Sequence, residues 1–428
     1  MPHSLLIKNA KLNGTPTDAL IVNGVFQTIA SNISAADGIP AIDAGGMVLA
    51  PAFYNGHTHA AMTLLRGYAD DMELFSWLHD CIWPAEAKLD SDLVYHGTRL
   101  AILEMIKTGT VFFNDMYWLA PATIRAVDEM GARAAIGRIF TDGSDGKLRA
   151  DMLENAKQSE AELDACGGTG RIRLTYAPHA VYTVSPKSLE WIAEQARHDC
   201  ATVHIHASET AKEVSDCITA NGCTPIALLA RCGILGDKTI LAHGVHLNDD
   251  DIKLIRESGA TIVHNPCSNY KLCSGQFHYR KVKELGGCRV VLGTDGNASN
   301  NNLSMFDEMK LAALSAKLES GDPSCAPAAD VWRMATADAA AAFGIKGGVI
   351  AEGYVGDALL LDNYAVQMCP EYNLAANVVY SCDTSCVDTV ICDGRVLMRH
   401  RRVEHETEII AAAQEAAHRF TASSKHTY

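Results

Sequence analysis

The feature of this sequence that most constrains its fold is a series of eight short apolar runs separated by longer stretches of helical pattern. Apolar strands that alternate with helices are typical of a parallel sheet covered by helices. Eight such units predict an α/β fold, a closed (β/α)8 TIM-type barrel. The runs span residues 47–59, 110–116, 133–140, 171–179, 202–207, 239–245, 261–266 and 289–295.

Both ends of the chain carry a different pattern. Residues 4–30 and 355–403 each contain short apolar runs joined by an Asn-Gly or Asp-Gly pair. Such a pair between apolar runs is a strong signal for a β-hairpin. The two ends therefore predict one small β-sandwich domain, assigned to residues 1–54 and 350–428 and including a helix near the C-terminus. The barrel is assigned to residues 55–349.

Composition narrows the classes of function. The 428 residues carry a formal net charge of -15, which disfavours nucleic acid and anionic membranes as partners. The 14 cysteines include no CxxC pair, so zinc-ribbon spacing is absent and free thiols are expected. No signal peptide and no membrane-spanning run is visible, and a cytoplasmic enzyme is expected.

Polar residues follow the predicted strands at the same end of every run. In a (β/α)8 barrel the carboxyl ends of the strands meet at one rim, where the active site lies. These residues are therefore expected to converge on one site. They are His57 and His59, Asn114 and Asp115, Arg138, His179, His206 and Glu209, His243, His264 and Asn265, and Asp295.

Four of these rim residues fit a metal site. His57 and His59 are two residues apart, so on a strand they point to the same side. His206 adds a third imidazole and Asp295 a carboxylate, and such a set with one open position suits a catalytic divalent ion. Zinc is the first choice, although iron or manganese would also fit these ligands. The alternative, four unrelated polar residues, requires four coincidences of placement.

Three further histidines are expected to have structural roles. His204 lies two residues before His206 and would face the same way, one layer deeper in the barrel. It is interpreted as a hydrogen-bonded barrel residue, and His246 and His264 as structural residues.

The sequence resembles the amidohydrolase superfamily, and within it the S-adenosylhomocysteine/5'-methylthioadenosine deaminases, over nearly the whole chain. HTHAAMTLLRG, WPAEAKL and GTDGNASNNN are the more specific matches. Further matches are YAPHAVYTVS, HIHASET, LAHGVHL and HNPCSNYKLCSG. The fourth run has no lysine that could bridge two ions, as in two-metal relatives, which favours one metal per chain.

The resemblance implies a reaction and roles for the rim residues. A metal held by His57, His59, His206 and Asp295 would activate water for attack on C6 of the adenine ring. Glu209 would deliver a proton to N1, Asp295 would accept the proton of the water, and His243 would assist at the water. Ammonia would leave, and the inosine analogue would remain.

Residues that contact the nucleoside carry over as well. Glu86 resembles the family glutamate that binds the ribose hydroxyls. The alternative is that Glu86 lies in the first turn of a helix after Pro84, where the helix dipole favours a negative charge. His179 resembles the histidine that contacts the purine or ribose. Trp77 is expected to line the pocket for the sulfur substituent, with a core position as the alternative.

The carboxylate of an amino-acid tail would need cationic partners. Arg138 is placed to meet such a carboxylate, for which a guanidinium is well suited. A second family arginine corresponds to Arg149, or alternatively to Lys147. Val181 stands where many relatives have proline, next to His179, and could alter the pocket.

Two other classes of function stay open at this stage. Deaminases of guanine, oxidised purines or pterins, and triazine hydrolases, share this barrel and metal site. The third possibility is a non-catalytic metal-binding or scaffold protein. The presence of the three residues expected to activate water, Glu209, His243 and Asp295, argues against it. A small nucleoside is the expected partner, and the relatives suggest a homodimer or homotetramer.

Overall fold

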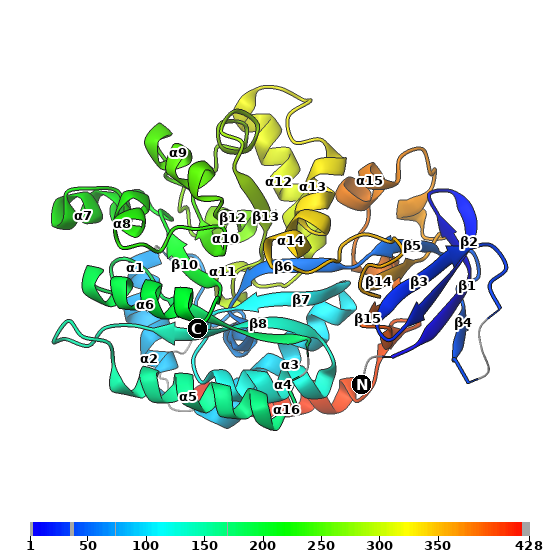
Figure 1. Cartoon of the computed structure of the whole chain (residues 1–428), viewed down its shortest axis with the longest axis horizontal. Helices are drawn as coiled ribbons and strands as arrows, with labels where there is room; N and C mark the ends of the chain where they lie inside the picture. The colour runs from blue at the N-terminus through cyan, green and yellow to red at the C-terminus, as the bar shows by residue number, and fades with distance from the viewer. Residues whose placement is uncertain (1–2, 35–37, 73, 169, 422–428) are drawn as a thin grey trace.

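A computed structural model of the chain describes residues 3–34, 38–72, 74–168 and 170–421. Figure 1 shows a helix-covered barrel joined to a smaller sheet, which lies on the right in that view. No helix in the described ranges is long and apolar enough to cross a membrane.

The barrel confirms the predicted fold. Its eight parallel strands follow one another in sequence order around the sheet. The first and last strands meet at the carboxyl end, where the amides of Thr294 and Asp295 donate to the His57 carbonyl at 3.1 and 3.0 Å. The strands are β6 (Phe53–Thr58), β7 (Thr110–Asp115), β8 (Arg133–Phe140), β9 (Ile172–Pro178), β10 (Val203–Ala207), β11 (Thr239–His243), β12 (Thr261–His264) and β13 (Arg289–Leu292).

Helices cover the outside of the barrel, and β7 and β8 are buried along their whole length. Burial on both faces explains why these strands are apolar runs without polar alternation. The main helices are α3 (Ser91–Lys107), α4 (Ala120–Met130), α5 (Ala150–Ala165), α6 (Pro186–His198), α7 (Ala211–Asn221), α8 (Pro225–Arg231), α9 (Asp249–Ser258), α10 (Pro266–Lys271), α12 (Met305–Ser320), α13 (Ala328–Met334) and α14 (Ala337–Ala342).

Side chains define where these helices begin and end. Asp90 accepts the Leu93 amide at 2.8 Å at the start of α3. Asn248 and Asp251 form a reciprocal capping box on α9, an arrangement that satisfies amides left unpaired in the first turn. The helix α4 ends at Gly131, whose φ of 79° suits glycine.

The two chain ends form one separate nine-stranded sheet. The sheet curls back on itself, because the amides of Phe26 and Gly356 donate to the carbonyls of Tyr354 and Gly24 at 2.9 and 2.7 Å. The strands are β1 (Leu5–Leu12), β2 (Thr15–Val22), β3 (Val25–Ala30), β4 (Ala41–Asp43), β5 (Val48–Pro51), β14 (Ala358–Leu361), β15 (Val387–Cys392), β16 (Arg395–Arg399) and β17 (Arg402–Val403).

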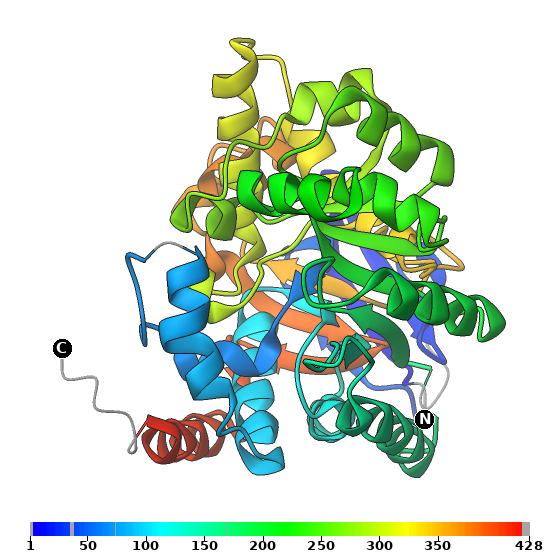
Figure 2. The same ribbon diagram turned by 90° about the vertical axis from the view of Figure 1, so that its left-hand side faces the viewer.

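Two details differ from the sequence-based assignment. The run at 47–59 divides at Ala52 into β5, which belongs to the small sheet, and β6, which belongs to the barrel. The expected boundary at residue 55 therefore falls inside β6. The C-terminal helix α16 (Glu406–Thr421), assigned to the small domain, instead lies against α3 of the barrel (Figures 1 and 2), where Phe420 joins an apolar cluster with Leu64 and Val94.

Candidate active site

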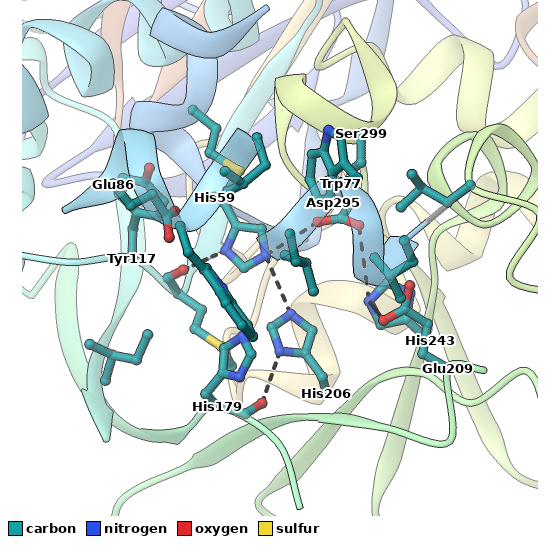
Figure 3. Close-up of a pocket in the computed structure, with 18 of the residues that line it drawn as sticks. His59, Trp77, Glu86, Tyr117, His179, His206, Glu209, His243, Asp295 and Ser299 are labelled. Carbon is teal, nitrogen blue, oxygen red and sulfur yellow. Dashed lines mark hydrogen bonds and ion pairs between the residues drawn. The ribbon is translucent and has the colours of Figure 1, made fainter. Parts of the chain in front are cut away.

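The carboxyl ends of the strands bring the predicted metal ligands together. His57 and Thr58 are the last two residues of β6, and His59 follows directly after the strand. Their Nε2 atoms lie 3.5 and 3.3 Å from Asp295 Oδ1, which follows β13. His206 on β10 places its Nε2 atom 3.3 Å from that of His59 (Figure 3).

Each imidazole is oriented by a contact through its other nitrogen. His206 Nδ1 donates to the His179 carbonyl at 2.9 Å, and His59 Nδ1 donates to the Met116 carbonyl. His57 Nδ1 lies 2.9 Å from His204 Nε2. Such contacts turn the free Nε2 atoms toward a common centre, as is typical of metal-binding histidines.

These donors fit a divalent cation. His57 Nε2 is buried and has no hydrogen-bond partner among the described residues. Burial lowers the pKa of His57 to about 4 and that of His206 well below its usual value, so both rings are neutral at pH 7 with a lone pair available. Neutral imidazoles and a carboxylate are a ligand set suited to zinc and similar ions.

His204 and two other histidines behave as expected. His204 is fully buried and supports His57 from below. His246 Nε2 lies 2.6 Å from the Ser274 carbonyl, and His264 stacks on Phe277 with ring centroids 4.3 Å apart. Within the described part of the chain, none of the three belongs to a group of residues that could hold a metal.

Beside the metal ligands lie two titratable groups that could move protons. His243 Nε2 lies 3.8 Å from Glu209 Oε2 and 4.0 Å from Asp295 Oδ2. Burial acts to lower the pKa of His243, but the carboxylates of Glu209 and Asp295 outweigh it and raise the pKa. His243 can also share a metal, because its ligand atom lies within 4.8 Å of those of His57 and His206.

Four polar residues that the sequence analysis did not assign hold this centre in place. Ser268 Oγ donates to Asp295 Oδ2 at 2.6 Å, and Asn269 Oδ1 lies 2.8 Å from His243 Nδ1. Ser274 donates to Glu209 at 3.1 Å. Glu213 accepts the Glu209 amide at 2.8 Å.

A sequence signal for three of these residues existed. Ser268, Asn269 and Ser274 all lie within HNPCSNYKLCSG, the segment matched to the family after β12. Glu213 lies in the first turn of α7, where a glutamate is common for reasons of capping alone.

A cavity opens over this centre in two compartments. The inner compartment lies over the metal ligands and is lined by residues including Trp77, Glu86, His179, Glu209 and His243. The outer compartment is more open and is lined by residues including Thr141, Asp142, Arg149 and Val181. Trp83, Glu86, Trp118, His179 and Tyr182 line both compartments and so join them.

Glu86 lies at the junction of the compartments, at the end of the short helix α2 (Trp83–Glu86). Burial raises its pKa to about 7, against the opposing effect of Trp118 and Tyr117. Trp77 lines the inner compartment and is also a buried core residue, whose indole donates to the Ala69 carbonyl at 3.0 Å. Trp77 therefore lines the cavity from a core position, and its contact with a sulfur substituent stays a prediction.

The structure does not bring Arg138 to the cavity, which corrects the sequence-based placement. Side chains alternate along a strand, and Ile139 of β8 faces the inner compartment. Arg138 faces the opposite way, toward the helices, where it pairs with Glu160 at 2.5 Å. Its guanidinium also stacks on Tyr176 at 4.0 Å and lies 3.9 Å from Asp199.

Arg149, by contrast, lines the outer compartment. Its side chain is half exposed and pairs with Asp151 at 2.5 Å. Lys147, the alternative to Arg149, is exposed and is not among the residues that line the outer compartment. Val181 lines this compartment close to His179.

The chain is similar in sequence and in fold to known proteins. Residues 48–397 match the model of the amidohydrolase family. A 5'-deoxyadenosine deaminase of Methanoregula boonei is 45% identical over 88% of this chain and 85% of its own length. A 5-methylthioadenosine/S-adenosylhomocysteine deaminase of Archaeoglobus fulgidus is 43% identical over 98% of this chain and 100% of its own.

Among solved structures, an adenosine deaminase from Xanthomonas campestris with bound zinc superposes with a TM-score of 0.90. The two chains are 32% identical, and the match covers 98% of this chain and 99% of the other. The likeness therefore extends over both the barrel and the sheet formed by the chain ends.

Proposed function

Because the chain belongs to the amidohydrolase family, we propose that it is a metal-dependent deaminase, which converts the 6-amino group of an adenosine derivative to the oxygen of the inosine analogue and releases ammonia. The observation that carries this proposal is the cluster of His57, His59, His206 and Asp295 under a cavity that also contains Glu209 and His243. The named relatives supply the substrate class.

One divalent metal per chain, zinc in the first instance, would be held by the four ligands. It supplies Lewis acidity, which lowers the pKa of a water toward neutrality. The choice of zinc is supported by the neutral imidazoles of the site and by the zinc in the Xanthomonas campestris structure. Iron and manganese suit the same ligand types.

The protein's own residues would move the protons. The purine ring occupies the inner compartment, and Glu209 delivers a proton to N1, which makes C6 a better electrophile. Glu209 then regains a proton from the C6 hydroxyl as the carbonyl of the product forms. Asp295 accepts a proton from the attacking water and passes it to the departing amine. Ser268 donates to Asp295 Oδ2 and so leaves Oδ1 facing the imidazoles of His57 and His59.

His243 would assist at the same water, because its Nε2 atom lies near both Glu209 and Asp295. The carboxylates of Glu209 and Asp295 raise the pKa of His243 and so favour the doubly protonated ring, in which Nε2 can donate a hydrogen bond to the water. Asn269 holds the opposite ring nitrogen and fixes the ring plane. Positioned acid and base groups of this kind contribute about 10²–10⁴-fold each.

Glu86 favours a nucleoside over a free base. Glu86 lines both the inner compartment, which lies over the metal ligands, and the outer compartment. There it would accept hydrogen bonds from the ribose hydroxyls, while His179 packs on the purine or ribose. A guanine, pterin or triazine substrate has no ribose and would leave Glu86 and the outer compartment unused.

The proposal is tested by incubating the zinc-loaded protein with 5'-deoxyadenosine, methylthioadenosine, S-adenosylhomocysteine and adenosine. Deamination is expected for at least one of them, as a change in adenine absorbance together with released ammonia. Glu209→Gln should retain stoichiometric zinc and lose about 10²–10⁴-fold in kcat. Zinc-loaded protein that deaminates none of the four, or that prefers a base without ribose, would contradict the proposal.

A further inference from the structure

Three sulfur atoms lie close together in the segment that joins β14 to β15. Cys382 Sγ lies 3.3 Å from Met368 Sδ, and the Cys382 thiol is also hydrogen-bonded to the Cys386 thiol. All three residues are buried, and we call them the sulfur triad. Hydrogen bonds between sulfur atoms are weak, whereas thiolates and thioethers are strong ligands for soft metal ions.

Backbone and side-chain hydrogen bonds hold the triad in place. Asn377 Nδ2 donates to the Met368 carbonyl at 3.0 Å, and the Cys382 amide donates to the Asn377 carbonyl at 2.8 Å. The Cys386 amide donates to the Asp383 carbonyl at 3.1 Å and closes a turn between the two cysteines. The folded chain therefore positions all three sulfur atoms before any ligand arrives, which favours binding.

The surroundings of Cys386 favour its thiolate form. The Cys382 thiol, the Asp383 amide and the Ser385 hydroxyl lower the pKa of Cys386, against the effect of burial. Arg401 donates to the first carbonyl of β15 at 3.2 Å, which places a positive charge beside the segment. The thiolate is the form that binds a metal, and hydrogen bonds to the ligand atoms are typical of metal sites.

Zinc does not suit this set of donors. Structural zinc takes four ligands, and the carboxylate between the two cysteines, Asp383, is occupied by other partners. Its Oδ1 atom accepts the Ser385 amide at 2.7 Å, and its Oδ2 atom accepts the Gln367 side chain at 3.0 Å. Within the described part of the chain, neither cysteine of the triad belongs to a group of three histidines, cysteines or carboxylates that could hold a metal. Two thiolates and a thioether, in contrast, are soft ligands that select Cu(I).

We propose that the sulfur triad binds one Cu(I) ion, in a site separate from the catalytic metal and independent of the deaminase function. Cys369 is exposed and directly follows Met368, so it offers a surface thiol at which an incoming ion can first bind. Binding releases the protons of the Cys382 and Cys386 thiols to the solvent, and copper and sulfur keep their oxidation states. The bound ion links Met368 to the two cysteines and should stabilise the segment between β14 and β15.

Anaerobic titration of the zinc-loaded protein with Cu(I), in competition with a colorimetric Cu(I) chelator, measures the affinity of the site. The wild-type protein is expected to bind one ion tightly, with the ultraviolet absorption of copper–thiolate bonds. Cys386→Ser should weaken this binding at least about 100-fold, because a hydroxyl is a poor ligand for a soft ion. Met368→Leu keeps the apolar volume and removes only the neutral thioether, so it should weaken the binding about tenfold.

Cys81→Ser is the matched control, because Cys81 Sγ lies 3.7 Å from Met72 Sδ in a similar thiol–thioether contact. This variant should bind Cu(I) as tightly as the wild-type protein. Far-UV circular dichroism and retained zinc show whether each variant is folded. Equal Cu(I) affinity in the wild-type protein, Cys386→Ser and Met368→Leu would overturn the inference.

A second measurement needs no variant in the triad. Because Cu(I) binds only the folded site, it should raise the Tm of the wild-type protein and of Cys81→Ser by several degrees. A Tm that Cu(I) leaves unchanged in the wild-type protein would contradict the inference. So would a disulfide between Cys382 and Cys386 in place of bound copper, detected by mass spectrometry after the titration.

Discussion

At the scale of single residues, Glu86 should control the pH dependence of catalysis. Burial raises its pKa to about 7, so below that pH the carboxyl gains a proton and becomes a weaker acceptor for ribose hydroxyls. We expect kcat/KM for a nucleoside to fall as the pH decreases through about 7. In Glu86→Gln this acidic limb should be absent, and kcat/KM above it should be about 10- to 100-fold lower.

The measurement is a pH profile of kcat/KM for both proteins. Glu154→Gln, on the exposed side of α5, removes an equivalent charge away from the cavity and should keep the profile of the parent. If kcat/KM of Glu86→Gln still decreases below about pH 7, a group other than Glu86 causes that decrease.

The residues of the centre differ in how far the sequence predicts them. His57, His59, His206 and Asp295 lie at strand ends, and all strand ends of a closed barrel share one rim. Arg138 also lies near a strand end, but one position of register decides whether a strand residue faces the cavity or the helices. Ser268 and Asn269 of α10 act through other residues, and their place in the segment HNPCSNYKLCSG indicates a role that their residue types alone do not.

At the scale of elements, the buried Glu308 links the loops that carry the centre. It lies in the first turn of α12, accepts the Cys267 amide of α10 at 3.2 Å, and accepts the Asn300 side chain of α11 (Asn297–Asn300) at 2.6 Å. Burial raises its pKa to about 8. The folded protein therefore keeps a proton that the unfolded chain releases at lower pH.

The sign of the effect on stability follows from this difference. Between the unfolded pKa of about 4.5 and the folded pKa of about 8, the folded state binds more protons. The contribution of Glu308 to the free energy of unfolding is thus largest at low pH and declines as the pH rises through this window. Glu308→Gln should remove this decline, as measured by urea unfolding across the window. Asp307 is an exposed neighbour, and Asp307→Asn should retain the decline of stability with rising pH. An unchanged decline in Glu308→Gln would show that another group causes it.

Element boundaries were harder to predict than element types. The run at 47–59 reads as one strand because its apolar residues are continuous, yet β5 and β6 join different sheets with only Ala52 between them. The pattern of apolar residues predicts that a strand is buried, but it does not predict which strand pairs with it. The hairpin turns at 23–24 and 393–394 were predictable because Asn-Gly and Asp-Gly specify their own local geometry.

At the scale of the whole molecule, a buried ionic network joins the small sheet to the barrel. Arg133 of β8 donates to Asp357 at 2.9 Å and to Asp393 at 2.6 Å. Tyr54 of β6 donates to the same Asp357 carboxylate at 2.7 Å. Asp357→Ala leaves Arg133 buried with less compensation and should lower the free energy of unfolding by about 3–5 kcal/mol.

Urea unfolding of Asp357→Ala measures this loss. Replacing Arg133 by Met in the same protein should recover part of the stability, because the buried charge is then removed as well. Asp216→Ala breaks the exposed pair with Lys212 and should cost less than about 1 kcal/mol. A similarly small cost for Asp357→Ala would show that the network does not stabilise the junction.

The composite sheet was predictable because its two halves carry the same pattern of short runs and Gly-containing turns. The position of α16 was not predictable. Its sequence indicates an amphipathic helix but does not indicate which surface its apolar face covers. In the structure that surface is α3 of the barrel, so the C-terminal segment contributes to both parts of the molecule.

The pairing of β5 with β14 has a consequence for biosynthesis. β5 pairs along its whole length with β14, and with β1 at only one position, Val48 opposite Lys11. The ribosome synthesises β14 about 300 residues after β5, so the nascent chain exposes an apolar strand edge until β14 has been made. Exposed edges of this kind recruit other chains. Premature termination before β14 should therefore yield aggregates, and rapid completion or chaperone cover of the nascent chain should favour a good yield.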